Sequence, residues 1–238
     1  MMNILLSKTE QDLLFLLEEL TKHHDWIEIP DLAKKMNFSI EELQEHLFKL
    51  EQLFPNLLLQ SSKKGIQLQF DFQNALDPRT AIFKQSETYS FLNQLFFNEG
   101  QSLEQMCQEL VMSCERVQEI IQHLNTNLPQ HYGISIQLSP LVMEGTEEDI
   151  RAFYLDYFSQ SYDFLDWPFP SISEESLTHL VQLFLDAQQV SPNLSSLRQI
   201  KYTLAINLER FNKRYLIKNP TPLLTSHYSS LMQIPQFE

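Results

Sequence analysis

Glycine, cysteine and positive charge are all scarce in this chain of 238 residues. It has four glycines and two cysteines, and its 17 lysines and arginines face 31 acidic residues. No apolar run approaches the roughly 20 residues that a membrane span requires, and the N-terminus lacks the basic-then-apolar pattern of a secretion signal. Few glycines and many Leu, Gln and Glu residues favour helices. We therefore predict a mainly helical, cytoplasmic protein with no membrane segment.

The sequence also lacks the short motifs of common enzyme classes. It contains no glycine-rich phosphate loop, no HExxH, no CxxC pair and no nucleophile elbow. We expect no enzyme activity, no bound metal and no cofactor.

A formal net charge of −14 has the wrong sign for a protein that approaches phosphates. The acidic excess is not confined to one half, because residues 1–146 contain 20 acidic and 10 basic residues. Any binding to DNA would therefore depend on local geometry, on dimerisation or on a small basic patch.

Residues 29–50 have the pattern of a helix-turn-helix. Ala33 is the small residue that lets two helices cross closely, Asn37 and Phe38 supply the turn, and Ser39 with Glu42 forms a capping box at the start of the second helix. The apolar positions of the two helices are Ile29, Leu32 and Met36, then Leu43, Leu47 and Leu50.

The same pattern occurs a second time after a shift of 74 residues, which places Cys107 on Ala33, Ser113 on Ser39 and Pro129 on Pro55. A repeat with matching cap, turn and terminating proline is more specific than a single helical hairpin. We predict two tandem helix-turn-helix units. We interpret Cys107 and Cys114 as small packing residues, with a redox-sensing pair as the alternative.

Each unit is predicted to contain three helices and a hairpin. Support helices over 7–21 and 87–98 precede the two motifs. The hairpins are 57–59 with 66–70, and 134–138 with 141–143. A hairpin directly after a recognition helix makes a winged helix, and Lys63 and Lys64 lie at the tip that would touch the DNA backbone. The alternative for two lysines at a loop tip is solubility.

The second half is predicted to be a helical bundle with helices over 147–159, 174–190 and 194–218. Its first part is rich in aromatic residues. Because aspartates are interleaved with them and would repel nucleic acid, we interpret these aromatic residues as a core or a subunit interface rather than as a platform for nucleic-acid bases. The last helix has six basic residues and one acid, and we expect these bases to neutralise acidic neighbours in the same bundle. The predicted domains are 1–76, 77–146 and 147–238.

Tandem winged helices followed by the stretch from Val142 to Phe153, with its G-x-E-x-x-I-R-x-F pattern, resemble the Mga/RofA-like regulators of Gram-positive cocci. The resemblance implies a mainly α fold: two tandem winged helix-turn-helix domains, each with a small hairpin wing, then a helical phosphotransferase-system regulation domain. Members usually continue into a second regulation domain and a domain similar to a phosphotransferase enzyme IIB. We therefore expect the chain to be a fragment of a longer protein.

The resemblance also implies a cytoplasmic transcription regulator of surface, virulence or sugar-responsive genes that binds double-stranded DNA. It implies self-association through the C-terminal half, which the aromatic surplus also favours, and phosphotransferase-system proteins as partners. Regulation-domain histidines are phosphorylated in some relatives of the family, and the candidates in this half are His179 and His227.

Residues near the start of each recognition helix would reach base edges. The outward positions include Glu45, Glu115 and Glu119, whose charges oppose binding to a polyanion. The predicted DNA-contacting residues are Ser39, Glu41, Gln44, Lys49, Lys63, Lys64, Ser113, Arg116, Gln118 and His123.

Two functions follow from these observations. The first is a DNA-binding regulator whose second half senses a signal or assembles subunits. The alternative is a protein-interaction module on degenerate winged helices, whose acidic surfaces contact a basic partner instead of DNA. A steep loss of duplex affinity with salt distinguishes the first from the second.

Overall fold

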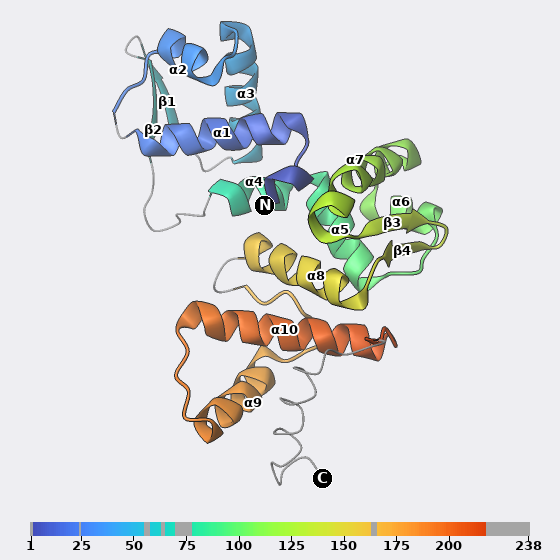
Figure 1. The fold of residues 1–238 in the computed structure, drawn as a ribbon. Helices are drawn as coiled ribbons and strands as arrows, with labels where there is room; N and C mark the ends of the chain where they lie inside the picture. The colour runs from blue at the N-terminus through green and yellow to red at the C-terminus, as the bar shows by residue number, and fades with distance from the viewer. Residues whose placement is uncertain are drawn as a thin grey trace.

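The computed structural model describes residues 2–23, 25–54, 58–62, 65–69, 78–162 and 166–217. Figure 1 shows two units, each made of helices and a small hairpin, followed by a helical region that contains α8, α9 and α10. The prediction of a mainly helical chain with small antiparallel hairpins is confirmed.

The first unit contains three helices and a two-stranded wing. The helices are α1 (Lys8–Lys22), α2 (Ile29–Met36) and α3 (Ile40–Leu53), and the wing pairs β1 (Leu58–Ser62) with β2 (Gly65–Gln69) in antiparallel register. Ile27 and Ile66 exchange two backbone hydrogen bonds of 2.8 Å, which attach the wing to the segment before α2.

The second unit repeats this arrangement. Its helices are α5 (Glu87–Phe97), α6 (Leu103–Leu110) and α7 (Cys114–Tyr132), and its wing pairs β3 (Ser135–Leu138) with β4 (Leu141–Glu144). Leu141 bonds to the backbone of Gly100 and Gln101, as Ile66 bonds to Ile27 in the first unit. The repeat therefore extends from the helices to the attachment of the wing.

The two helix-turn-helix turns have the same backbone geometry. Asn37 (φ 56°) and Val111 (φ 54°) both adopt the left-handed conformation after the first helix. The next amide in each unit bonds back to the carbonyl of the small residue, Ala33 or Cys107, at 2.9 and 3.0 Å. The predicted apolar positions of the recognition helices are buried at Leu43, Leu47, Leu50, Val117, Ile121 and Leu124.

Three sequence-based expectations differ from the structure. Pro129 does not end its helix, because α7 continues to Tyr132 and stops at Gly133 in the left-handed conformation; packing of buried Leu128 and the contact of Tyr132 with Phe153 hold the last turn. The final helix, α10 (Leu194–Asn212), ends before the predicted Lys218, which lies outside the described residues.

The third difference concerns the cysteines. Cys107 and Cys114 form a disulfide between α6 and α7, so their interpretation as separate packing thiols is wrong. Cys107 is nevertheless buried at the position that Ala33 occupies in the first unit, as the repeat predicted.

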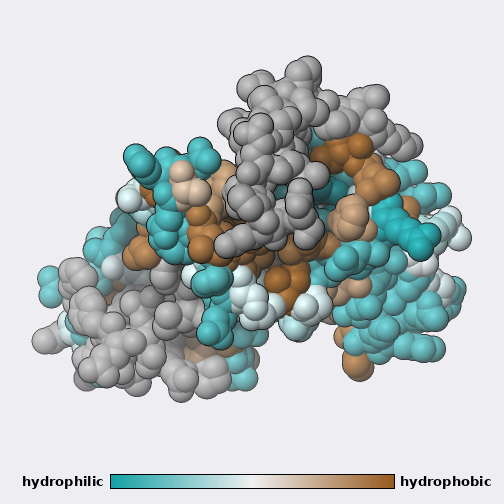
Figure 2. All heavy atoms as spheres, turned by 90° about the horizontal axis from the view of Figure 1, so that it is seen from below, coloured by the Kyte–Doolittle hydropathy of each residue, from teal (hydrophilic) through white to brown (hydrophobic). Residues whose placement is uncertain are grey.

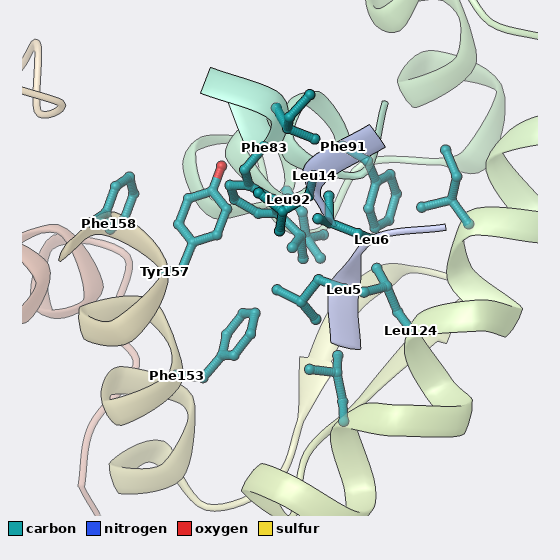
Figure 3. Close-up of a cluster of buried hydrophobic side chains, with 14 of the residues drawn as sticks. Leu5, Leu6, Leu14, Phe83, Phe91, Leu92, Leu124, Phe153, Tyr157 and Phe158 are labelled. Carbon is teal, nitrogen blue, oxygen red and sulfur yellow. The ribbon is translucent and has the colours of Figure 1, made fainter. Parts of the chain in front are cut away.

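Two short segments that the sequence did not reveal connect the parts of the molecule. The N-terminal 3₁₀ helix η1 (Met2–Leu5) packs on α7 and α8, and α4 (Pro78–Gln85) packs on α1, α5 and α8. Figure 3 shows Leu5 and Leu6 within a cluster that includes Phe91, Leu124 and Phe153 from three different helices. The units therefore share one continuous core.

Helices α8 (Glu147–Ser161), α9 (Glu174–Ala187) and α10 make the rest of the described chain. Five of the aromatic residues predicted as core or interface are fully buried and contact one another, namely Phe153, Tyr154, Tyr157, Phe158 and Phe169. Tyr162 and Trp167 are half-buried, and Phe164 lies outside the described residues. The burial of the five removes the aromatic surplus as an argument for self-association. Other apolar side chains, on α9 and α10, are exposed, and brown hydrophobic areas are visible on the face in Figure 2.

Candidate nucleic-acid interface

Helix α3 presents a polar outer face next to its buried stripe. Ser39 caps the helix: its hydroxyl accepts from the Glu42 amide at 3.1 Å, and its own amide donates to the Glu42 carboxylate at 2.8 Å. That carboxylate has a pKa below its ordinary value because it accepts the Ser39 bonds. The exposed outer positions are Glu41, Gln44, Glu45, Phe48 and Lys49.

Helix α7 has a similar face, but its arginine is already paired. Ser113 caps the helix by accepting from the Arg116 amide at 3.2 Å. The Arg116 guanidinium bonds to Glu119 at 2.9 Å and to Glu87 of α5 at 2.6 Å, and these two bonds raise its pKa. A phosphate near Arg116 would therefore have to compete with two carboxylates.

His123 lies at the α7 position that corresponds to Lys49 in the first unit. The side chain is half-buried, and its Nε2 atom is shielded from solvent with no hydrogen-bond partner among the described residues. That nitrogen is thus directed into the protein. Gln118, five residues earlier in the same helix, is exposed, as is Glu115.

The two units differ in their number of basic residues, since the equivalent residues 13–70 of the first unit contain six lysines. Residues 87–144 contain one arginine, no lysine and seven acidic residues, namely Glu87, Glu99, Glu104, Glu109, Glu115, Glu119 and Glu144. The first unit has exposed lysines on both motif helices. Lys35 is paired with Glu19, whereas Lys34 and Lys49 make no ion pair within the described part of the chain. Lys63 and Lys64, the predicted wing-tip contacts, lie outside the described residues.

The candidate phosphorylation site His179 is exposed on α9. It lies on the side opposite the buried Leu177, Val181 and Leu185, as predicted, and near Gln182 and Asp186, which share a hydrogen bond of 2.8 Å. His227 lies outside the described residues.

A buried charged network, which the sequence did not reveal, joins the second winged helix to the helical half. Arg210 of α10, 1% exposed, binds Glu147 at the start of α8 through two bonds of 2.9 and 2.7 Å. It also binds Glu99, 0% exposed, which accepts from the amide of Met143 in β4 at 2.7 Å. A single guanidinium therefore links α10, α8, the end of α5 and the wing.

Arg151 and Lys213 extend this network. Arg151 binds Glu147 at 2.8 Å and the carbonyl of Tyr215 at 2.9 Å. Lys213 donates to the carbonyl of Phe97 at 2.9 Å, and burial lowers its pKa. The expectation that basic residues of the last helix neutralise acidic neighbours is confirmed for Arg210 and also for Lys201, which pairs with Glu174 at 2.5 Å.

The network gives a physical meaning to the pattern that carried the family resemblance. Gly145 has φ 148°, and a Cβ there would lie 2.7 Å from Ile134. Glu147 and Arg151 are members of the network, and Ile150 and Phe153 are buried. The pattern thus marks the joint between the second wing and α8.

No helix in the described ranges is long and apolar enough to cross a membrane. Over those same ranges, no group of three or more His, Cys, Asp and Glu side chains is placed to hold a metal ion.

Comparison with protein families matches both units. Residues 7–66 match the M protein trans-acting positive regulator (MGA) HTH domain, and residues 73–158 match the Mga helix-turn-helix domain. The second match extends through most of α8 and therefore includes the joint. These families and the names of the curated relatives describe regulators, not enzymes.

The curated relatives include a putative trans-acting regulator of Streptococcus pneumoniae serotype 4, which is 34% identical over 88% of this chain and 43% of its own length. The anthrax toxin expression trans-acting positive regulator of Bacillus anthracis is 25% identical over 97% of this chain and 50% of its own. The capsule synthesis positive regulator AcpB of Bacillus anthracis is 20% identical over 85% and 42%. The chain spans about half, or less, of the length of these relatives.

Proposed function

The chain belongs to the Mga family of helix-turn-helix regulators, and from this premise we propose that it is a DNA-binding transcription regulator whose first winged helix makes the main phosphate contacts. The observation that supports this division is the difference between the units in the number and pairing of their basic residues. Lys34 and Lys49 are exposed and unpaired among the described residues, whereas Arg116 is held by two carboxylates. Phosphate contacts supply most of the non-specific affinity for DNA.

Base contacts would come from the outer faces of the recognition helices. Gln44, Gln118 and Glu41 are exposed on these faces; the two glutamines would pair with adenine, and the glutamate would accept from cytosine. Ser39 and Ser113 serve as caps that set where each helix begins. Lys63 and Lys64 belong to the same proposal through their position between the strands of the first wing.

The test is fluorescence anisotropy of the intact chain with a random-sequence duplex at low and moderate salt. We expect an affinity that falls steeply with salt, and a loss of about tenfold or more in K34E/K49E. K8E/R214E changes the net charge equally at exposed residues outside the motif helices and should bind nearly as well as the wild type. If both double variants lose the same duplex affinity, net charge alone explains the loss, and Lys34 and Lys49 do not belong to the interface.

Arg116→Glu is the corresponding test for the second unit. Because Glu87 and Glu119 already compensate Arg116, we expect the reversal to weaken duplex binding much less than K34E/K49E. A folded protein with no duplex binding at low salt would favour the alternative function, an interaction module for a basic partner, which the seven acidic residues of the second unit support.

For residues 147–238, of which the structure describes 147–162 and 166–217, we propose a regulation domain of the phosphotransferase-system type that senses a signal and self-associates. Seven of the 12 exposed large apolar residues in the described chain support the second role, because they belong to α9, α10 and the adjoining segments: Leu180, Leu183, Val190, Leu194, Leu208, Phe211 and Leu216. His179 is the proposed phosphoacceptor, with phosphotransferase-system proteins as donors. The names of the relatives, which refer to capsule synthesis and toxin expression, support surface or virulence genes as targets. A phosphotransferase-system regulation domain would support control by sugars.

Light scattering of the intact chain tests the self-association. Phe211 is 63% exposed, so Phe211→Asp should preserve the fold and lower the mass from a multiple of 28.1 kDa to one chain. Phe15→Asp, at an exposed phenylalanine of α1, is the control and should retain the multiple. A wild-type mass of one chain at all concentrations would refute the proposal.

A further inference from the structure

The disulfide lies across the turn of the second helix-turn-helix. It joins Cys107 of α6 to Cys114, the first residue of α7, with Cα atoms 5.5 Å apart. The bridged segment contains Val111, which is 91% exposed in a left-handed conformation. The cross-link therefore constrains the connection that sets the position of the second recognition helix.

The first unit provides an internal comparison, because it makes the same turn without a cross-link. Ala33 and Ile40 occupy the positions of the two cysteines, and Asn37 occupies that of Val111, with φ angles that agree within 2°. Asparagine enters the left-handed region readily, whereas a β-branched residue does so at a cost. The first unit thus makes this turn without a cross-link, whereas in the second unit the valine makes the same backbone conformation less favourable.

The two sulfurs differ in access. Cys107 is 5% exposed, whereas Cys114 is half-buried. Cys114 also begins a helix of 19 residues, where the thiolate form of a cysteine is favoured. An external oxidant or thiol would therefore react first at Cys114, and Cys107 would complete the reaction.

We propose that Cys107 and Cys114 form a reversible thiol–disulfide site that adjusts the local stability of the second helix-turn-helix to the redox state. With hydrogen peroxide as oxidant, the Cys114 thiolate attacks one peroxide oxygen, the O–O bond breaks with release of hydroxide, and a sulfenic acid forms. The Cys107 thiolate then attacks that sulfur and displaces hydroxide. Two thiols and hydrogen peroxide thereby give one disulfide and two molecules of water.

A dithiol reverses the reaction. One of its thiolates attacks the Cys114 sulfur and releases the Cys107 thiolate, and its second thiol resolves the mixed disulfide. The dithiol becomes a disulfide, and the cysteine pair gains two electrons and two protons. Loss of the cross-link then leaves the α6–α7 turn dependent on its own conformational preference.

The experiment compares the intact chain after treatment with hydrogen peroxide and after treatment with dithiothreitol. Maleimide labelling under denaturing conditions should add no label to the oxidised chain and two labels to the reduced chain, as measured by mass. Hydrogen exchange of segment 107–114 should then be at least about tenfold faster in the reduced chain, while the equivalent segment 33–40 is unchanged.

The control variant is C107A/C114S, in which residue 107 matches Ala33 of the first unit. Its exchange should be insensitive to either reagent, and the single variant C114S serves the same purpose if the double variant fails to fold. Two free thiols after peroxide treatment would overturn the proposal. So would identical exchange of segment 107–114 in the oxidised and reduced wild type. Neither readout depends on duplex binding.

Discussion

Replacement of Arg210 by methionine tests whether the joint between the second winged helix and the helical half holds the two together. Methionine retains much of the length of the side chain but removes its charge and all its donors. Glu99 and Glu147 would then remain buried, at 0% and 9% exposure, without their shared partner.

The expected cost follows from this burial. Breaking a buried ion pair by removing one partner costs about 3–5 kcal/mol, because the remaining charge is uncompensated. For a chain of this size, that loss corresponds to a fall in Tm of roughly 10 °C. The matched control is Arg116→Met: Arg116 also binds two carboxylates, but its side chain is 46% exposed, and its loss should cost less than about 1 kcal/mol.

The effect of Arg210→Met should also depend on pH. Burial alone would raise the pKa of Glu147, but hydrogen bonds from Arg210 and Arg151 hold that pKa below its ordinary value. A lowered carboxyl pKa stabilises the fold above the unfolded pKa of about 4.3, and this stabilisation is lost as the pH falls through the folded value. Without Arg210 the pKa of Glu147 rises, so the difference in unfolding free energy between wild type and variant should shrink between pH 7 and pH 5.

Urea unfolding at several pH values measures both effects. Equal costs for Arg210→Met and Arg116→Met at pH 7 would refute the reasoning, because they would mean that burial of the network does not matter. A difference between wild type and Arg210→Met that does not change with pH would remove Glu147 from the explanation.

Two further pairs of substitutions, each a test with its control, probe the packing. Gly65→Ala places a Cβ 2.0 Å from the carbonyl oxygen of Ile27, whereas the Cβ of Gly100→Ala, also at positive φ, meets nothing within 4 Å. Urea unfolding should show a loss of about 1–2 kcal/mol from backbone strain in Gly100→Ala and a larger loss in Gly65→Ala. Equal losses would contradict the close approach of the wing to Ile27. By the same assay, Leu5→Ala should cost about 2–5 kcal/mol because Leu5 is fully buried. The control Phe15→Ala, at a 56% exposed side chain, should cost less than about 1 kcal/mol. A small loss in Leu5→Ala would show that η1 does not hold the units together.

The tandem units could be predicted from the sequence because their determinants are local. Ser39 with Glu42 fixes one helix start, and Ala33 and Cys107 occupy equivalent small positions; such features lie within one or two helical turns of each other. The hairpins follow from alternating apolar residues at short separation. The same local pattern places Glu41 and Gln44 on an outer face.

Features that depend on distant residues could not be predicted in this way. The bond between Arg210 and Glu99 spans 111 positions, and neither residue has a local pattern that distinguishes it from a surface charge. Likewise, the pairing of Arg116 with Glu87 depends on how α7 packs on α5. The sequence therefore predicted Arg116 as a DNA-contacting residue without revealing the carboxylates that already neutralise it.

Under the proposed function, the joint also bears on how a signal from the helical half would reach the two winged helices. Glu99 connects Arg210 of α10 to the amide of Met143 in the second wing, and Lys213 of the same terminal region binds the end of α5. A shift of α10 therefore either breaks buried ionic contacts or moves α5 and the wing with it. Breaking the buried contacts costs far more free energy than losing an exposed ion pair. Since η1 and α4 tie the first unit to α7 and α8, such a movement would also change how the two recognition helices lie relative to each other.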